Sequence, residues 1–159
     1  MFTDHFQAGV LDVVCSLILD VAAARPAAKH LLEMMQHQTS LGLAAPQIGI
    51  TSSIIIINAP RLNVGKSEII MLNPSVIVSS DERCSQSETC TSYPGFNVSI
   101  VRPRSVFVEY IDLEGKVHRE EYNDLVARVV QHEIDHLDGM TILDRAPRQI
   151  RRKYLASRR

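Results

Sequence analysis

The sequence contains no tryptophan, only three cysteines and no apolar run long enough to cross a membrane. Three cysteines are too few for a disulfide framework, and their scarcity favours a reducing compartment. An apolar stretch near the start, GVLDVVCSLILDVAAA, is interrupted by Asp12 and Asp20, whereas a membrane-spanning helix needs about 20 apolar residues. No Lys or Arg precedes Arg25, so the basic start of a signal peptide is missing too. These absences predict a cytoplasmic protein with no membrane partner.

Charge of either sign is not in excess, because 17 Lys and Arg stand against 18 Asp and Glu. This balance gives no sign of the broad basic surface that binds nucleic acid. The chain is long and apolar enough to bury a core, with 45% hydrophobic residues, and we expect residues 1–159 to form one domain. Only the end of the chain is strongly basic, and we interpret it as a solvated helix end. Its cationic residues are Arg148, Arg151, Arg152, Lys153, Arg158 and Arg159.

Two helices flank a β-rich middle in the predicted order of elements. Pro26 fits the first turn of a helix that runs to about Gln38. Asn123 or Asp124 can cap a second helix that ends at Gly139. The order helix, strands, helix is typical of an α+β fold, rather than of a doubly wound parallel sheet. We expect small antiparallel or mixed sheets packed around the second helix.

The middle of the chain contains several strand signals. The β-branched run SSIIIINA is typical of a strand that is buried on both faces. The segment EIIMLNPSVIVSS predicts two short strands that break at Asn73-Pro74, and SVFVEYIDLEGKVHREEY predicts a hairpin with its turn at residues 112–116. The preceding segment GLAAPQIGI contains Gly42, Pro46 and Gly49, and it is expected to form a shaped loop.

The second predicted helix contains the segment QHEIDHLDG, in which two histidines stand four residues apart with Glu133 between them. At about 100° per residue, His132 and His136 share one stripe with Leu125 and Val129, where core residues are expected. Two neutral histidines in a core need partners for their ring nitrogens, and a divalent metal ion takes one nitrogen from each. The pattern therefore indicates a metal site. The remaining arc of the helix is polar and consists of Arg128, Gln131, Asp135 and Asp138.

A third protein ligand is needed, because two histidines do not hold a catalytic metal ion alone. A metzincin places this ligand downstream, at a position that Ile142 occupies here. Upstream, Cys90 in SETCTSYPG is the best candidate, since its neighbours are small and polar and a Pro-Gly turn follows. Cys15 and Cys84 are weaker candidates. A thiolate with two imidazoles leaves a fourth position for water, the arrangement of a hydrolytic site.

Three segments in this order, GLAAPQIG, ETCTS and QHEIDHLDG, resemble the three signature motifs of peptide deformylases. The family patterns are approximately Gly-x-Gly-x-Ala-Ala-x-Gln, Glu-Gly-Cys-Leu-Ser and Gln-His-Glu-x-Asp-His. The similarity runs from about residue 26 to residue 146. The resemblance implies an enzyme that hydrolyses N-formyl-methionyl peptides at the start of nascent chains, releasing formate and a free amino terminus.

The resemblance also implies roles for particular residues. Cys90, His132 and His136 would hold one divalent metal ion, Fe²⁺ in the cell and replaceable by Zn²⁺, Ni²⁺ or Co²⁺. Glu133 would act as general base and then as general acid. Gln47 would donate a hydrogen bond to the formyl oxygen as negative charge develops there.

Substrate binding is expected along the first motif and the second helix. The extended peptide would pair with the backbone around Leu41 and Gly42 like an added strand. Its methionine side chain would enter an apolar pocket formed by Leu41, Leu125 and Val129. We expect a monomer, and the basic chain end is a candidate contact with the ribosome.

The sequence departs from the family patterns along the substrate path. Ser40 takes the place of the first motif's first glycine, and Asn97 replaces an arginine that many members carry after the Pro-Gly turn. In the second motif, Thr89 replaces glycine and Thr91 replaces leucine. We expect Thr89 and Thr91 to border the substrate, where a branched and more polar wall would alter peptide preference.

Two other functions remain open at this point. One is a deformylase-like metallohydrolase, or a weakly active homologue, that acts on another N-acyl or short peptide substrate. The other is a non-catalytic module with a structural metal ion. The second is disfavoured because a structural site is usually closed by a fourth protein ligand and has no use for Glu133.

Overall fold

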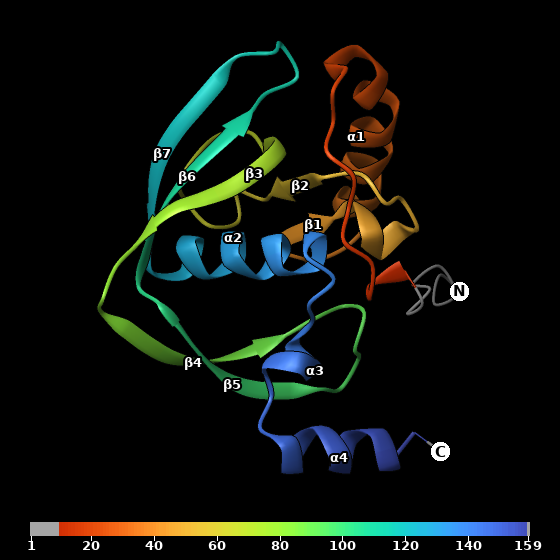
Figure 1. The fold of residues 1–159 in the computed structure, drawn as a ribbon, viewed down its shortest axis with the longest axis vertical. Helices are drawn as coiled ribbons and strands as arrows, with labels where there is room; N and C mark the ends of the chain where they lie inside the picture. Colours follow the sequence, from red (N-terminus) through yellow and green to blue (C-terminus); the bar gives the residue numbers. More distant parts are fainter. Residues whose placement is uncertain (1–9, 159) are drawn as a thin grey trace.

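A computed structural model describes residues 10–158 as a mixture of α-helices and antiparallel strands (Figure 1). The elements in chain order are α1 (Val21–Gln36), β1 (Gly42–Ala44), a short 3₁₀ helix η2 (Ala45–Ile48), β2 (Ile54–Ile57), β3 (Ile69–Ser79), β4 (Arg83–Thr89), β5 (Asn97–Pro103), β6 (Ser105–Ile111), β7 (Val117–Asn123), α2 (Asp124–Leu137), α3 (Ile142–Arg145) and α4 (Arg148–Ala156).

The strands form two antiparallel sheets, one above and one below α2 in Figure 1. The larger sheet has the order β1-β2-β3-β6-β7, and the smaller sheet pairs β4 with β5. Every pairing between these strands is antiparallel. The predicted α+β class, with sheets around the second helix, is therefore confirmed.

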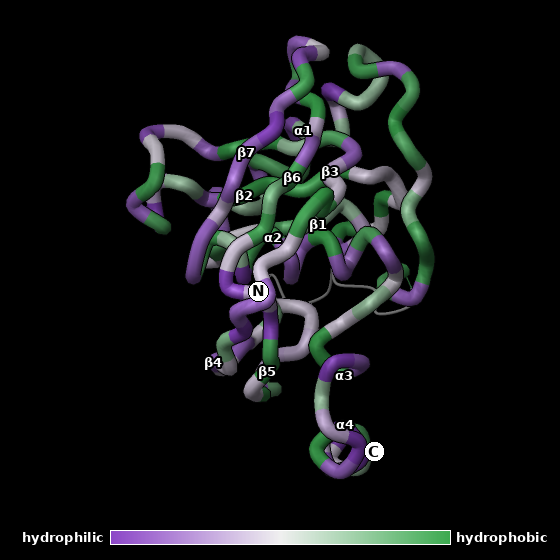
Figure 2. The backbone as a smooth tube through the Cα atoms, turned by 60° about the vertical axis from the view of Figure 1, so that its left-hand side comes forward, coloured by the Kyte–Doolittle hydropathy of each residue, from purple (hydrophilic) through white to green (hydrophobic). Residues whose placement is uncertain are grey.

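The four isoleucines of β2 are all fully buried, as the β-branched run predicts. Side chains alternate across a strand, so Ile54 and Ile56 pack with α1 while Ile55 and Ile57 pack with α2. Figure 2 shows apolar residues gathered where these strands meet the helices. β2 thus joins the two halves of the core, because it packs against α1 on one face and against α2 on the other.

Two predicted boundaries are wrong. The first helix begins at Val21, not at Pro26, because the Asp20 carboxylate caps it by accepting the N–H groups of Ala22 and Ala23 at 2.9 and 3.3 Å. The second error lies in β3, which runs without a break through Asn73-Pro74.

Asn73 explains why β3 continues through that position. It adopts a positive φ of 51°, and its side chain bonds both the N–H and the C=O of Ile18 at 2.8 Å. The chain therefore makes a register shift between Leu72 and Ser75 and returns to the same partner strand. The predicted hairpin of β6 and β7 is confirmed, and the predicted loop at GLAAPQIGI contains β1 and η2.

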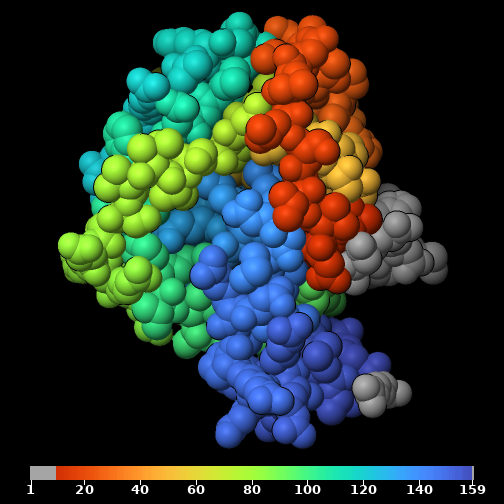
Figure 3. All heavy atoms as spheres, in the orientation of Figure 1, coloured from red at the N-terminus to blue at the C-terminus, as the bar shows by residue number. Residues whose placement is uncertain are grey.

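The C-terminal end of α2 is held by the segment that precedes α1. The Cys15 N–H donates to the Leu137 carbonyl at 2.8 Å, and Val14 bridges Asp138. Figure 3 shows this segment, in red, lying against the blue residues that follow α2. Gly139 ends the helix with a φ of 70°, and a Cβ there would lie 3.1 Å from the backbone carbon of Asp12.

The basic α4 stands apart at the bottom of Figures 1 and 2, and none of its residues is fully buried. It contacts the rest of the protein through Tyr154, whose ring centroid lies 4.5 Å from that of Phe96. This agrees with a solvated helix end, although Arg159 lies outside the described residues. Within residues 10–158, no helix is both long enough and apolar enough to span a membrane.

We predict that Gly139→Ala destabilises the protein more than Gly115→Ala. Both glycines have positive φ, which costs an alanine about 1–2 kcal/mol. Only Gly139 also faces a crowded backbone, since nothing lies within 4 Å of a Cβ at Gly115. Urea unfolding measures the difference. Equal losses in the two variants would show that the segment before α1 does not press on the helix end.

Candidate metal centre

Three potential ligands, one from the segment after β4 and two from α2, meet at the junction of the two sheets. The donor atoms of Cys90, His132 and His136 all lie within 4.8 Å of one another, and Cys90 Sγ lies 3.4 Å from His136 Nε2. Ligands at about 2.3 Å for sulfur and 2.1 Å for nitrogen in a tetrahedron are separated by about 3.6 Å. The donor set therefore fits a divalent metal ion, and it leaves one position open among the described residues.

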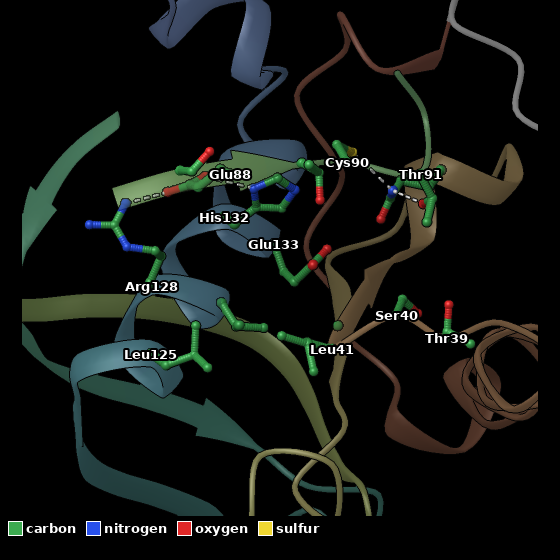
Figure 4. A pocket seen from close by; sticks show the side chains of 15 residues that line it. Thr39, Ser40, Leu41, Glu88, Cys90, Thr91, Leu125, Arg128, His132 and Glu133 are labelled. Carbon is green, nitrogen blue, oxygen red and sulfur yellow. Dashed lines mark hydrogen bonds and ion pairs between the residues drawn. The ribbon is translucent and has the colours of Figure 1, made fainter. Parts of the chain in front are cut away.

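Glu88 orients the first histidine. Its Oε2 accepts the Nδ1–H of His132 at 3.0 Å, which leaves Nε2 on the side of Cys90 (Figure 4). Burial opposes the charge of Glu88, but the hydrogen bonds from His132 and Arg102 outweigh it and lower the pKa of Glu88 to about 2. An ionised carboxylate thus stands behind the His132 ring.

The pKa values of the two histidines are shifted in opposite directions. Burial opposes a charge on His132, yet its hydrogen bonds with Cys90 and Glu88 raise its pKa above the ordinary value. Burial and the charge of His132 lower the pKa of His136. A metal ion binds neutral imidazoles, so its binding would be coupled to the release of a proton from His132.

Glu133 points into the cavity beside this donor set (Figure 4). It is 4% exposed, its Oε2 has no hydrogen-bond partner, and burial raises its pKa to about 7. Buried carboxylate oxygens are rarely unpaired, and water held by an ion would pair this one. Gly42 makes room for the carboxylate, because a Cβ there would lie 2.7 Å from Glu133 Oε1.

The amide of Gln47 is fixed with its nitrogen toward the donor set. Its Oε1 accepts the Ala44 N–H at 2.8 Å, so Nε2 must point the other way. That nitrogen lies 3.1 Å from Ser92 Oγ, 3.4 Å from Thr91 Oγ1 and 3.6 Å from Cys90 Sγ. A buried N–H donor is thus aimed at the space next to the thiol.

One cavity of about 390 Å³ is lined by two of the three potential ligands, Cys90 and His132, and by Gln47, Glu88 and Glu133. Every residue that the sequence predicts for substrate binding lines it too, namely Leu41, Gly42, Thr89, Thr91, Leu125 and Val129. Leu41 and Leu125 lie on one side, while Cys90 and Thr91 lie on the other (Figure 4). The structure therefore brings together every predicted site residue.

Sequence reasoning missed a network of buried charges behind the ligands. Arg102 donates Nε and Nη2 to the two oxygens of Glu88 at 2.6 and 3.0 Å, and its Nη1 to Asp135 at 2.8 Å. Asp135 in turn accepts Arg145 Nε at 2.8 Å. Arg128 also donates to Glu88, at 2.6 Å.

One member of the network carries a signal in the sequence. Val98, Ile100 and Arg102 are alternate buried residues of β5, so the period of two places Arg102 on the inner face. Arg128 and Asp135 carry no such signal. Both are buried against β4 and β5, two segments that are not among the predicted strands.

Comparisons with known proteins point to one family. The profile of the polypeptide deformylase family matches residues 5–152. A peptide deformylase of Picosynechococcus is 36% identical over 126 residues, which cover 79% of this chain and 67% of the relative. One of Natranaerobius thermophilus is 41% identical, covering 74% of this chain and 72% of the relative. The aligned part thus spans about two thirds of the length of the cyanobacterial relatives.

Solved structures give the same result. The peptide deformylase of Synechococcus elongatus in complex with actinonin matches with a TM-score of 0.88 and 29% identity, over 98% of this chain and 86% of that one. The enzyme of Plasmodium falciparum matches with a TM-score of 0.84 and 27% identity, over 93% and 87%.

We predict that the protein binds one equivalent of Zn²⁺ or Co²⁺ through the thiolate of Cys90. Binding should raise the melting temperature, because the ion binds only the folded chain. Cys90→Ala should lose most of this shift and the thiolate-to-cobalt absorption band, whereas the control Cys84→Ala should keep both. An unchanged band in Cys90→Ala would assign the sulfur ligand elsewhere.

Proposed function

The chain belongs to the peptide deformylase family, and on this premise we propose that Cys90, His132 and His136 hold the metal ion of its deformylase site. The enzyme removes the N-formyl group from formyl-methionyl peptides and releases formate. The observation that carries the residue assignment is the meeting of three ligand atoms in the cavity that also holds Glu133 and Gln47.

The divalent ion, when bound, acidifies a water molecule and polarises the formyl carbonyl. Glu133 accepts the proton of that water and returns it to the amine as the C–N bond breaks. Its burial suits both steps, because a carboxyl with a raised pKa takes up and gives back a proton near neutral pH. Gln47 Nε2 donates to the formyl oxygen, and one such buried donor contributes about 3 kcal/mol to transition-state stabilisation.

The cavity walls bind the rest of the peptide. β1 is the end strand of the larger sheet, so the backbone of Leu41 and Gly42 offers an edge to which an extended peptide adds as a strand. Leu41, Leu125 and Val129 form the apolar side that receives the methionine side chain. Thr89 and Thr91 are exposed on the opposite side, where they border the path of the peptide backbone.

We extend the proposal to the cellular setting. Fe²⁺ is the ion in the cell, with Zn²⁺, Ni²⁺ or Co²⁺ as substitutes in vitro, because a thiolate and two imidazoles suit all of them. Residues 1–159 act as one catalytic domain and as a monomer in the cytoplasm, on nascent chains. The basic end of the chain, which includes α4, is the candidate contact with the ribosome.

Formate release from formyl-Met-Ala-Ser by the metal-loaded protein tests the proposal, and Glu133→Gln tests the base. We predict that Glu133→Gln keeps the metal ion but lowers kcat by orders of magnitude, because the amide has the carboxylate's shape without its proton affinity. Metal content, measured alongside, is the control. Near wild-type turnover of Glu133→Gln would remove Glu133 from the mechanism.

We also predict that Thr89→Gly raises kcat/KM, most for peptides with a large residue after formyl-Met. Removing one or two methyl-sized groups that the bound peptide would press against is worth about 1–3 kcal/mol, so about 10-fold is expected. Thr91→Leu is the matched control and should change kcat/KM less, since it retains the backbone N–H. A small, equal response across all second residues would show that the peptide does not pass Thr89.

A further inference from the structure

Arg128 is buried one turn before His132 on α2, and it is only 4% exposed. Its Nη1 donates to Glu88 Oε1 at 2.6 Å and to the Ile100 carbonyl at 2.9 Å. Its Nη2 donates to the Cys84 carbonyl at 2.7 Å. A single guanidinium on α2 thus contacts both strands of the smaller sheet.

Arg128 completes the hydrogen bonding of Glu88. Oε1 accepts Arg102 Nε and Arg128 Nη1, each at 2.6 Å, and Oε2 accepts Arg102 Nη2 and His132 Nδ1, each at 3.0 Å. A carboxylate offers about four lone-pair directions, so all of them are occupied. Glu88 cannot turn about its side-chain bonds without losing charged hydrogen bonds.

The two arginines approach from different parts of the fold. Arg102 lies on β5, the strand that pairs with β4, so its side chain fixes the Glu88 carboxylate within the smaller sheet. Arg128 lies on the helix that carries His132, so it fixes the same carboxylate relative to the histidine (Figure 4). Cys90 follows shortly after Glu88 in the chain, so the contact between Arg128 and Glu88 links the segment that carries the thiol to the helix that carries the imidazoles.

We propose that Arg128 is a positioning residue of the metal centre, which acts through Glu88 to hold His132 in the orientation that binds the ion. This inference rests on the proposed metal site. The simpler alternative is that Arg128 only attaches the smaller sheet to α2 through the carbonyls of Ile100 and Cys84. The two differ in whether the effect of Arg128 requires the charge of Glu88.

A double-mutant cycle separates these roles. The variants are Arg128→Leu, Glu88→Gln and the pair, and the readouts are Zn²⁺ affinity by chelator competition, the absorption spectrum of the Co²⁺ form, and the melting temperature of the metal-free protein. Arg128→Leu should weaken Zn²⁺ binding about 10- to 100-fold and shift the Co²⁺ spectrum. In the Glu88→Gln background, Arg128→Leu should weaken Zn²⁺ binding only about threefold or less.

Arg104→Leu is the matched control. Arg104 also links α2 to the segment between β3 and β4. It contacts Asp124 at the start of α2 and Glu82 in that segment, at 2.7 Å each, but it does not contact Glu88. It should leave Zn²⁺ affinity unchanged. If Arg128→Leu does not fold, Arg128→Lys replaces it in the cycle under the same criteria, because lysine keeps the charge without the planar fork.

Equal losses of affinity in both backgrounds would overturn the proposal, and so would a lower melting temperature with unchanged Zn²⁺ affinity. Failure of the deformylase assignment looks different. In that case the wild-type protein would bind no stoichiometric metal ion or release no formate, whatever the cycle shows.

Discussion

The carboxylate of Glu88 lies at the point where the smaller sheet meets α2, and its charge has to be compensated there. A buried carboxylate is costly unless it is paired and hydrogen-bonded. Arg102, Arg128 and His132 supply the partners, and they come from β5 and α2. The packing of α2 between the two sheets and the geometry of the metal centre therefore depend on the same contact.

This dependence continues away from the cavity. Arg102 forms ion pairs with both Glu88 and Asp135. Asp135 also pairs with Arg145, which lies beyond the end of α2. Charges of alternating sign thus follow one side of the helix from its metal-facing turn to its C-terminus. Since each charge has its partner, the helix can bury polar residues on the side that faces the smaller sheet.

The sequence predicts the parts of the site that local spacing determines. His132 and His136 share a helical stripe, and the isoleucine run of β2 predicts a strand buried on both faces. The polar side of α2 could not be interpreted in this way, because periodicity gives the direction of Arg128 but not what covers it. Both strands of the smaller sheet cover it, and in β4 the residues Ser85, Gln86 and Ser87 resemble loop residues rather than a strand.

The fold brings several of the residues that depart from the family patterns close to one cavity. Thr89 and Asn97 are direct partners across β4 and β5, so two changed positions lie side by side, and Thr89 lines the cavity. Ser40 lies on the other side of the same cavity, with its hydroxyl buried and without a partner. The donor set keeps the residue types of the family patterns, whereas Thr89 and Thr91 on either side of Cys90 depart from them. Peptide preference is where this chain should differ from its relatives.

X-ray absorption of the Zn²⁺-loaded protein measures the donor set of the metal ion most directly. We predict one sulfur at about 2.3 Å and two imidazole nitrogens at about 2.0–2.1 Å, with a light atom from water as the fourth ligand. A first shell without sulfur, or one closed by a second sulfur, would contradict the assignment of Cys90, His132 and His136.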